Sequence, residues 1–330
     1  MPVGPAISAS RATGEVLVFL DADLLVGPDA IAGFVRWYDR SPACVVTGTI
    51  GFVDLAGLDL AALDAAISSR SLAAHLAGRA ADDQAWRENT FRRTCDLTVD
   101  ESDLFRIWVG AVMCVPRALH ESIGGLRELG MRGIEDTEYG YRLHNAGGLF
   151  VLDRSIELWH QGKRFFDTQA AKQVKSERRQ LMDELIAEPS FRASGRTPRR
   201  VPMAVVQPAG GEIEGLAGSA RADVEVLHDS GDVEERRDLA ASPFRFVVLG
   251  DSRFGPDSVD DAISWMYESG IGVVHLVDPE GNDLVRVLRT RALGRAGLLG
   301  AATPAEQQAE AGRLFGEWRL PADQFGIAPA

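Results

Sequence analysis

The sequence predicts an α/β protein in which a mixed sheet is flanked by helices, followed by a second, smaller α/β unit. Along the 330 residues, short apolar runs of strand length alternate with amphipathic stretches of helix length, and Gly and Pro separate them. Such alternation is typical of α/β architecture. The hydrophobic share of 45% and the charged share of 25% are ordinary for globular chains, and the length suggests two domains.

The first predicted elements lead to a pair of aspartates. Residues 1–13 are small, and we expect them to be irregular. The nearly continuous apolar run 15–20 predicts a strand buried on both faces, as in a parallel sheet. Gly27-Pro28-Asp29 is a turn that opens a helix over 30–38, because proline is favoured close to a helix start. Residues 44–50 predict the next strand.

The rest of the chain continues the alternation. In order, we expect helical structure over 55–88, a strand over 104–115, a short helix from Pro116 to Gly124-Gly125, a helix over 135–145, a strand over 149–152 and a helix over 169–188. Residues 189–202, with three prolines, predict a linker. We therefore place one domain at 1–190 and a second α/β unit at 200–330.

Charge and cysteine content exclude several classes of partner. The net charge of −13 repels phosphate backbones, so we expect no nucleic-acid partner. The longest apolar runs are far short of the roughly 20 residues of a membrane span, and the N-terminus shows no secretory signal. Cys44, Cys95 and Cys114 fit neither a zinc knuckle nor a disulfide framework. A reduced, cytoplasmic location is the simplest interpretation.

Asp21 and Asp23 flank one alanine where the first strand ends. In extended backbone, residues two apart point the same way, so both carboxylates converge above the edge of the sheet where open α/β sheets bind ligands. Two carboxylates with room for water suit Mg²⁺ or Mn²⁺. A cation there bridges a diphosphate and neutralises the charge that develops as it leaves. The alternative is a pair of acidic residues that cap the next helix.

A second group of charged residues begins the helix predicted over 135–145. Asp136 stands where the helix macrodipole favours a carboxylate, so an ionised Asp136 could accept a proton from an attacking hydroxyl. Glu138 and Arg142 are four residues apart on one helix face and could pair. The alternative is an ordinary acidic helix start with one surface salt bridge.

Trp159 and His160 follow the strand predicted over 149–152. A neutral imidazole at His160 could complete the metal shell, and the indole of Trp159 could stack on a sugar ring. The alternative for His160 is a purely structural role.

Taken together and in this order, these stretches resemble the GT-A-fold family 2 glycosyltransferases. Polypeptide GalNAc-transferases, bacterial chondroitin-type polymerases and the galactosyltransferase C-terminal module are similar. The resemblance covers roughly residues 9–165 and implies a GT-A-like, Rossmann-like mixed sheet. The stretches that carry it are Ala12–Asp23, Gly110–Arg117, Gly124–Glu128, Glu135–Glu138 with Arg142-Leu143, and Trp159-His160.

The resemblance implies a metal-dependent transfer of a sugar from a nucleotide-sugar donor to a hydroxyl of a saccharide or another acceptor. UDP is the expected nucleotide, and Mn²⁺ or Mg²⁺ is the expected cofactor. Asp136 resembles the catalytic base of an inverting displacement. The other positions that resemble the family's site are the metal ligands Asp21, Asp23 and His160, and the residues Glu135 and Gly110 of the donor and acceptor pocket.

The sequence departs from the family pattern in two places. Family members carry further strands before the Asp-x-Asp strand, and here that motif starts at residue 21. We therefore expect a misplaced start site, a fragment, or a partner chain or second copy that supplies the missing half. In addition, Leu126-Arg127 replaces the usual Phe-Asp pair after Gly124-Gly125, which bears on how the acceptor is positioned.

The C-terminal half repeats part of this pattern, which predicts a degenerate GT-A-like unit over about 200–318. Its metal motif is reduced to Gly250-Asp251-Ser252, so we expect a structural or interaction role. Chance similarity between two strand–turn–helix units is the alternative. The matching pairs are Gly27–Trp37 with Gly255–Trp265, Val18–Asp23 with Val247–Ser252, Cys44–Val46 with Gly272–Val274, and Pro116–Leu119 with Thr290–Leu293, and upstream 201–207 and 224–231 resemble the family's first strands.

Two other functions compete with the transferase. A phosphohydrolase of the HAD type also places Asp-x-Asp at a strand end, with Asp21 then acting as a nucleophile. Gly250-Asp251-Ser252 with Asp257 loosely resembles the late metal motif of that class. The other alternative is a non-catalytic glycosyltransferase fragment or subunit.

Overall fold

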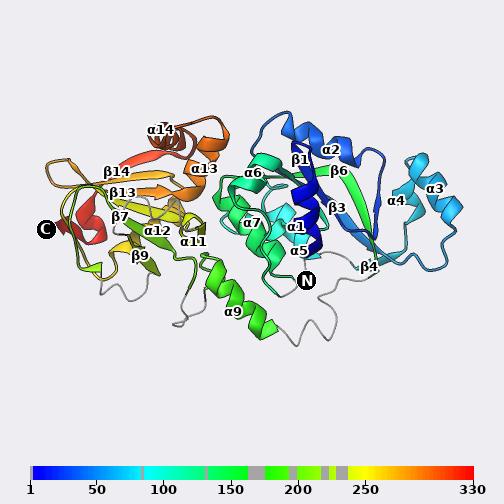
Figure 1. Ribbon diagram of the computed structural model, residues 1–330, viewed down its shortest axis with the longest axis horizontal. Coiled ribbons are helices and arrows are strands. Elements are labelled where there is room, and N and C mark those ends of the chain that lie inside the picture. Colours follow the sequence, from blue (N-terminus) through cyan, green and yellow to red (C-terminus); the bar gives the residue numbers. More distant parts are fainter. Residues whose placement is uncertain are drawn as a thin grey trace. The chain divides into compact units, whose positions relative to one another are not determined.

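The computed structural model describes residues 3–82, 85–130, 133–162, 175–192, 199–216, 223–227 and 237–330 (Figure 1). The chain divides into two compact units. Unit 1 comprises Met1–Leu143 and Leu149–Gln180, and unit 2 comprises His144–Gly148 and Leu181–Ala330. Each unit contains a mixed sheet with helices against it, which confirms the predicted α/β class.

Unit 1 is built on a sheet with the strand order β1-β5-β3-β6-β2, and β4 pairs with β3. The β3–β6 pair is parallel, whereas β1–β5, β5–β3 and β2–β6 are antiparallel. The strands are β1 (Val16–Leu20), β2 (Leu24–Val26), β3 (Cys44–Val53), β4 (Ala80–Asp82), β5 (Val112–Pro116) and β6 (Leu149–Gln161).

The core of unit 1 lies between this sheet and α2. Phe34 of α2 is fully buried and packs in one cluster with Val46 of β3 and with Ile156 and Leu158 of β6. The helices of this part of the chain are α1 (Val3–Arg11), α2 (Ala30–Tyr38), α3 (Leu60–Ser68), α4 (Leu72–His75), α5 (Ala85–Arg93), a 3₁₀ turn (Leu104–Ile107), α6 (Arg117–Ser122), α7 (Glu135–Asn145) and α9 (Lys175–Leu185).

The start of the chain differs from its prediction. Residues expected to be irregular form α1, in which Ala9 is buried. Pro5 is compatible with this helix because it stands in the first turn, where backbone N–H groups have no partner within the helix. Small residues gave no hydrophobic period by which the helix could be recognised.

The strand before the two aspartates is formed, but its surroundings were predicted wrongly. β1 is an outer strand of the sheet, pairs antiparallel with β5, and buries only Leu17. An apolar run alone does not distinguish a central parallel strand from an edge strand that helices cover.

Three other boundaries also differ. The run 104–115 is a 3₁₀ turn followed by β5, and the stretch 55–88 contains α3, α4 and β4 before α5 begins. β6 extends far beyond the predicted 149–152, so His160 lies inside a strand. The helix predicted over 169–188 is described only from Lys175, as α9, and residues 193–198 of the predicted linker lie outside the described residues.

Unit 2 has a sheet with the strand order β14-β12-β13-β10-β7-β9 and a smaller one with the order β15-β11-β8. Its main core includes Phe244, Phe246 and Met266. The elements are β7 (Ala204–Pro208), β8 (Ile213–Glu214), β9 (Val224–Val226), α11 (Arg237–Ala240), β10 (Phe244–Val248), β11 (Ser252–Phe254), α12 (Ser258–Ser269), β12 (Val273–Val277), β13 (Asp283–Arg289), α13 (Thr290–Leu298), α14 (Pro304–Phe315), β14 (Glu317–Pro321), a 3₁₀ turn (Ala322–Phe325) and β15 (Ile327–Pro329).

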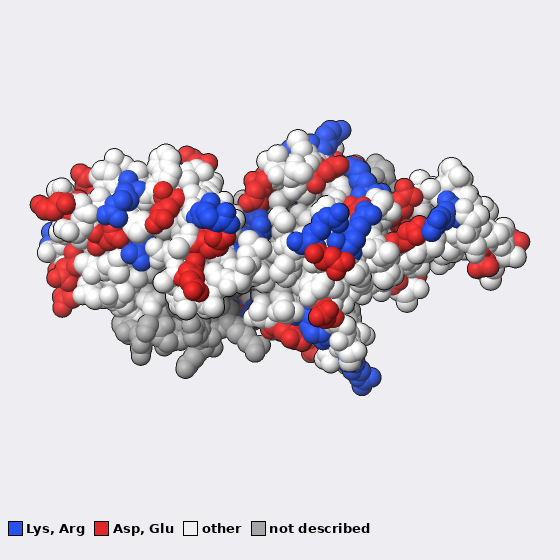
Figure 2. All heavy atoms as spheres, turned by 90° about the horizontal axis from the view of Figure 1, so that it is seen from above, with Lys and Arg blue, Asp and Glu red and all other residues white. Residues whose placement is uncertain are grey.

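Charged side chains of both signs lie on the surface of the described residues. On the described part of the face in Figure 2, acidic and basic side chains are interspersed. None of the helices in the described residues combines the length and the apolar character that a membrane span requires.

Candidate metal and substrate site

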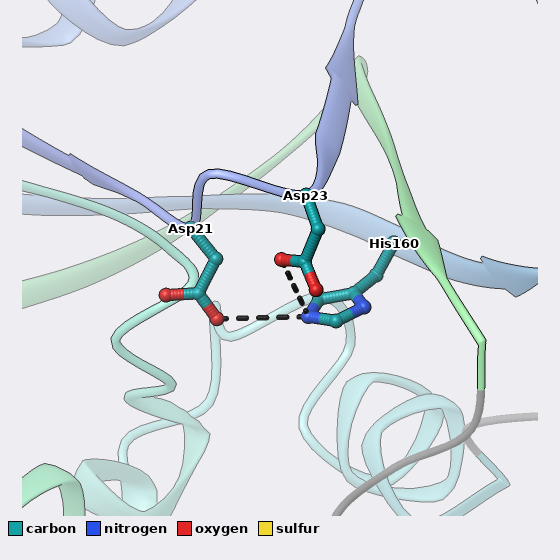
Figure 3. Close-up of side chains that lie close together, drawn as sticks. All are labelled: Asp21, Asp23 and His160. Atoms are coloured by element: carbon teal, nitrogen blue, oxygen red, sulfur yellow. Dashed lines mark ion pairs between the residues drawn. The ribbon is translucent and has the colours of Figure 1, made fainter.

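Three predicted metal ligands meet at one end of the sheet of unit 1 (Figure 3). Asp21 and Asp23 lie in the turn that joins β1 to β2. His160 stands near the end of β6, where it is paired directly with Leu24 of β2. The antiparallel β2–β6 pair therefore brings the late histidine next to the two early aspartates.

The side chains converge on the imidazole of His160. Its Nε2 lies 3.6 Å from Oδ2 of Asp21 and 3.3 Å from Oδ1 of Asp23. Both aspartate side chains are 51% exposed, whereas the His160 side chain is 16% exposed. The expected convergence of the carboxylates is present, although it arises from a turn and not from the alternation of a strand.

His160 is held in place from two sides. The ring of Phe52 stacks on the imidazole with 4.8 Å between centroids and 22° between planes. Nδ1 lies 2.9 Å from the carbonyl oxygen of Gln161. If Nδ1–H donates to this carbonyl, Nε2 keeps its lone pair toward the carboxylates. Phe52 was not predicted from the sequence, because its place opposite His160 depends on the β3–β6 register.

The three ligand atoms lie within 4.8 Å of one another. Lone pairs that face one another at this distance repel unless a proton or a cation lies between them. Two carboxylate oxygens and one imidazole nitrogen suit Mn²⁺, and carboxylates with water suit Mg²⁺. Among the described residues, no second group of this kind is present. The donor set thus fits the metal expected from the sequence.

A cavity of about 300 Å³ adjoins the metal ligands through Asp21. This volume is at the lower end of the range typical of small-molecule sites. It brings together the predicted metal ligand Asp21, the predicted base Asp136, and Gly110 and Glu135 of the predicted donor and acceptor pocket. The lining residues are Pro5, Phe19, Asp21, Trp108, Val109, Gly110, Ala111, Leu126, Glu135 and Asp136.

Asp136 is the second residue of α7, and Gly110 lies directly against it. A Cβ atom at Gly110 would be 2.7 Å from Oδ1 of Asp136, so only glycine fits without movement of the carboxylate. The neighbouring Glu135 accepts hydrogen bonds from the amides of Gly133 and Ile134, the latter at 2.9 Å. These amides fix Glu135 at the helix N-terminus, where negative charge is favoured.

Two aromatic side chains that were not predicted from the sequence line the cavity. Phe19 and Trp108 line the cavity, with 5.8 Å between their ring centroids, and both contact Tyr139. Nδ1 of His120 lies 2.5 Å from the hydroxyl of Tyr139. Burial, and after it the charge of Arg142, lowers the pKa of His120, which favours a neutral imidazole. Phe19 and Trp108 each stand two residues before a predicted site residue, which is the one local signal for them.

Trp159 occupies a different environment from His160. Its indole packs against Gly51, where a Cβ atom would be 2.5 Å from the ring, and against the cluster around Val53, Leu63 and Leu72. Adjacent residues of a strand face opposite sides of the sheet, which separates Trp159 from the metal ligands. Its predicted stacking on a sugar ring stays a prediction.

Glu138 and Arg142 form the predicted pair, but in the interior. Nε and Nη2 of Arg142 lie 2.6 and 2.8 Å from the carboxylate of Glu138, and both side chains are buried. Arg127, at 3.3 Å, is a second cation on Glu138, and Arg142 also donates to the carbonyl of Ile123. The unusual Arg127 therefore ties the loop that carries Leu126, a cavity residue, to the helix that carries Asp136.

Residues 7–113 match the family model of Glycosyl transferase family 2. Over these residues the chain is similar to family 2 glycosyltransferases, and its mixed α/β fold is GT-A-like. This match favours a glycosyltransferase over the phosphohydrolase.

Among solved structures, the chain is similar to a crystal structure of GalNAc-T7 with UDP, GalNAc and Mn²⁺. The sequence identity is 16% and the TM-score 0.32, and the match covers 57% of this chain. The chain spans 37% of the length of that relative. No curated protein matches the chain.

Proposed function

We propose that unit 1 transfers a sugar from a nucleotide-sugar, with UDP as the nucleotide, to a hydroxyl acceptor with inversion at the anomeric carbon. Asp21, Asp23 and His160 would hold Mn²⁺ or Mg²⁺. The observation that carries the proposal is the meeting of these three ligands beside a cavity that contains Asp136, in a unit whose residues 7–113 match the Glycosyl transferase family 2 model.

In this proposal Asp136 acts as general base. The acceptor hydroxyl gives its proton to Asp136, its oxygen bonds to the anomeric carbon, and the bond to the nucleoside diphosphate breaks with its electron pair on the leaving oxygen. A bound divalent cation supplies charge stabilisation for that leaving group. Phe19 and Trp108 offer apolar surface to a sugar ring, and Glu135 offers a fixed acceptor for its hydroxyls.

The outer edge of β1 supports a further part of the proposal. In the described residues of unit 1, β1 has no strand on the side away from β5. We expect a further segment, from a longer form of this polypeptide or from a partner chain or second copy, to add to this edge and complete the nucleotide side of the site. If such a segment is required, the chain alone would behave as a non-catalytic subunit.

The proposal is tested with a panel of UDP-sugars, Mn²⁺ and saccharide acceptors, by measuring released UDP. Asp136→Asn should lower turnover by ~10²–10⁴-fold, the usual contribution of a general base. Donor binding should change little, because Asn keeps the shape of the side chain. Glu121→Gln, on the surface of α6, is the matched control. Equal rates of acceptor-dependent UDP release in Asp136→Asn and the unchanged chain would rule out the assigned base.

A further inference from the structure

Four strands of the main sheet of unit 1 have the same order and directions as four strands of the main sheet of unit 2. In unit 1, β1 pairs antiparallel with β5, β5 antiparallel with β3, and β3 parallel with β6. In unit 2, β10 pairs antiparallel with β13, β13 antiparallel with β12, and β12 parallel with β14. The short strands correspond as well, because β2 pairs antiparallel with the end of β6 and β11 pairs antiparallel with β15.

The correspondence extends to individual residues. Adding 228 to the residue numbers of β1, of β2 and of the first residue of α2 gives those of β10, β11 and α12. The pair Val46↔Cys114 corresponds to Val274↔Val287 at the same position of the ladder.

A connecting hydrogen bond is repeated too. The amide of Arg117 donates to the carbonyl of Glu15 at 2.8 Å, and the amide of Thr290 donates to that of Pro243 at 2.9 Å. A shared order, shared directions and a shared register are not expected of two unrelated α/β units.

We propose that unit 2 is a second copy of the framework of unit 1 in which the cation position has been closed by the chain itself. This inference takes from the proposed function that Asp21, Asp23 and His160 hold the cation. By the register, Asp23 corresponds to Asp251, Asp21 to Leu249, and His160 to Pro329, since Leu24↔His160 corresponds to Ser252↔Pro329. Two of the three ligands are therefore replaced by side chains that bind no metal.

The same register corrects the sequence alignment in one place. Matching Val18–Asp23 with Val247–Ser252 is one residue out of step, because the ladder places Val18 with Phe246. The sequence comparison also matched residues 224–231 to the family's first strands, and of these, residues 228–231 lie outside the described residues.

Asp251 contacts the backbone of a neighbouring loop, whereas Asp23 lies beside His160. Its Oδ1 accepts a hydrogen bond from the amide of Glu212 at 2.9 Å, and the carbonyl of Glu212 accepts one from Ser252 at 2.9 Å. Gly211 packs so closely that a Cβ atom there would be 2.3 Å from Gly250. The loop between β7 and β8 thus rests on the strand end that in unit 1 carries the metal ligands. Asp251 anchors this loop.

The number of bound cations tests the closed position. We would titrate the full chain with Mn²⁺ and follow free Mn²⁺ by electron paramagnetic resonance. The inference predicts one Mn²⁺ per chain, lost in Asp23→Ala and retained in Asp251→Ala. Two bound ions, or loss of the bound ion in Asp251→Ala alone, would overturn it. No bound ion at all would count against the proposed cation site of unit 1 and leave the closed position of unit 2 as inferred.

Hydrogen exchange tests the anchor without any metal. In Asp251→Ala, amides of residues 209–216 should exchange about tenfold faster, the effect of losing one hydrogen bond. The matched variant is Asp257→Ala, at the start of α12, where the aspartate makes no side-chain cap, and it should leave them unchanged. Unchanged exchange over 209–216 in Asp251→Ala would contradict the anchoring role.

Discussion

Side chains of unequal exposure make up the proposed metal site. His160 is stacked on Phe52 and tied to a backbone carbonyl, whereas Asp21 and Asp23 are half-exposed. The histidine thus provides a fixed point, and the carboxylates can adjust to a cation that demands its own coordination distances. Support of a ligand by neighbouring groups is a general feature of metal sites.

Gly110 offers a sharp test of the cavity. Gly110→Ala places a methyl group 2.7 Å from Oδ1 of Asp136, which must then move. We expect sugar transfer to fall by about 100-fold, the scale of a misplacement near 1 Å, while the chain stays folded. Steady-state kinetics and circular dichroism would measure both. Gly14→Ala, whose methyl group makes only an ordinary 3.4 Å contact, is the control, and equal activity of the two variants would show that Asp136 is not confined as described.

His120 makes the stability of the fold dependent on pH. Burial, then Arg142, lowers its pKa below 6.5 in the folded state, so the unfolded state takes up a proton first as the pH falls. Its contribution is therefore constant above this value and destabilising below it. His144 acts in the same direction, because burial and then Arg291 lower its pKa.

We expect the loss of stability between pH 7 and pH 5 to be smaller in His120→Asn than in the unchanged chain. Urea unfolding at several pH values measures it. An equal or steeper loss in the variant would contradict the neutral, buried state of His120.

At the scale of elements, close packing of β3 and α2 on β6 depends on two glycines that face Ile156. A Cβ atom at Gly48 would be 2.4 Å from the backbone oxygen of Ile156, and one at Gly33 would be 2.6 Å from its side chain. Ile156 is fully buried. A side chain can turn away more easily than a backbone carbonyl in a sheet.

We therefore expect Gly48→Ala to lower the free energy of unfolding by ~1–3 kcal/mol, the usual cost of overpacking, and Gly33→Ala to lower it by less. Alanine favours a helix over glycine, which offsets part of the cost in α2. Denaturant unfolding measures the free energy of unfolding of both variants. A larger decrease for Gly33→Ala than for Gly48→Ala would contradict the tighter contact described at β3.

Elements with local signals were predicted well, and those set by partners were not. The helix over 30–38 begins after Gly-Pro-Asp and the helix over 135–145 ends before Gly-Gly, and both have the predicted bounds. The exposure of β1 and the length of β6 depend on which strands lie beside them. A local sequence pattern does not identify these neighbouring strands.

The candidate site divides in the same way. The carboxylates, Gly110 and His160 belong to short motifs and were predicted, although their roles stay predictions. Phe19, Trp108 and Phe52 were missed, because an aromatic residue in an apolar run looks like any core residue until the register is known.

At the scale of the whole molecule, the chain contains two units of similar strand arrangement, for which we propose different roles. Each has its own buried cluster, around Phe34 in unit 1 and around Phe244 in unit 2. The proposed cation ligands among the described residues belong to unit 1 alone, and the corresponding end of unit 2 is covered by its own loop. The net charge of the chain is −13, and an acidic chain repels a diphosphate. A bound cation would offset this repulsion at the proposed site.

The central claim is that unit 1 binds a nucleotide through a cation held by Asp21, Asp23 and His160. Calorimetric titration of UDP into the full chain, with and without Mn²⁺, tests it most directly. We predict binding that requires Mn²⁺ and disappears in the double variant Asp21→Ala/Asp23→Ala. UDP binding that needs neither the metal nor the aspartates would contradict the claim. No binding by a well-folded chain would contradict a complete nucleotide site in this chain and would make the further segment at the edge of β1 a requirement.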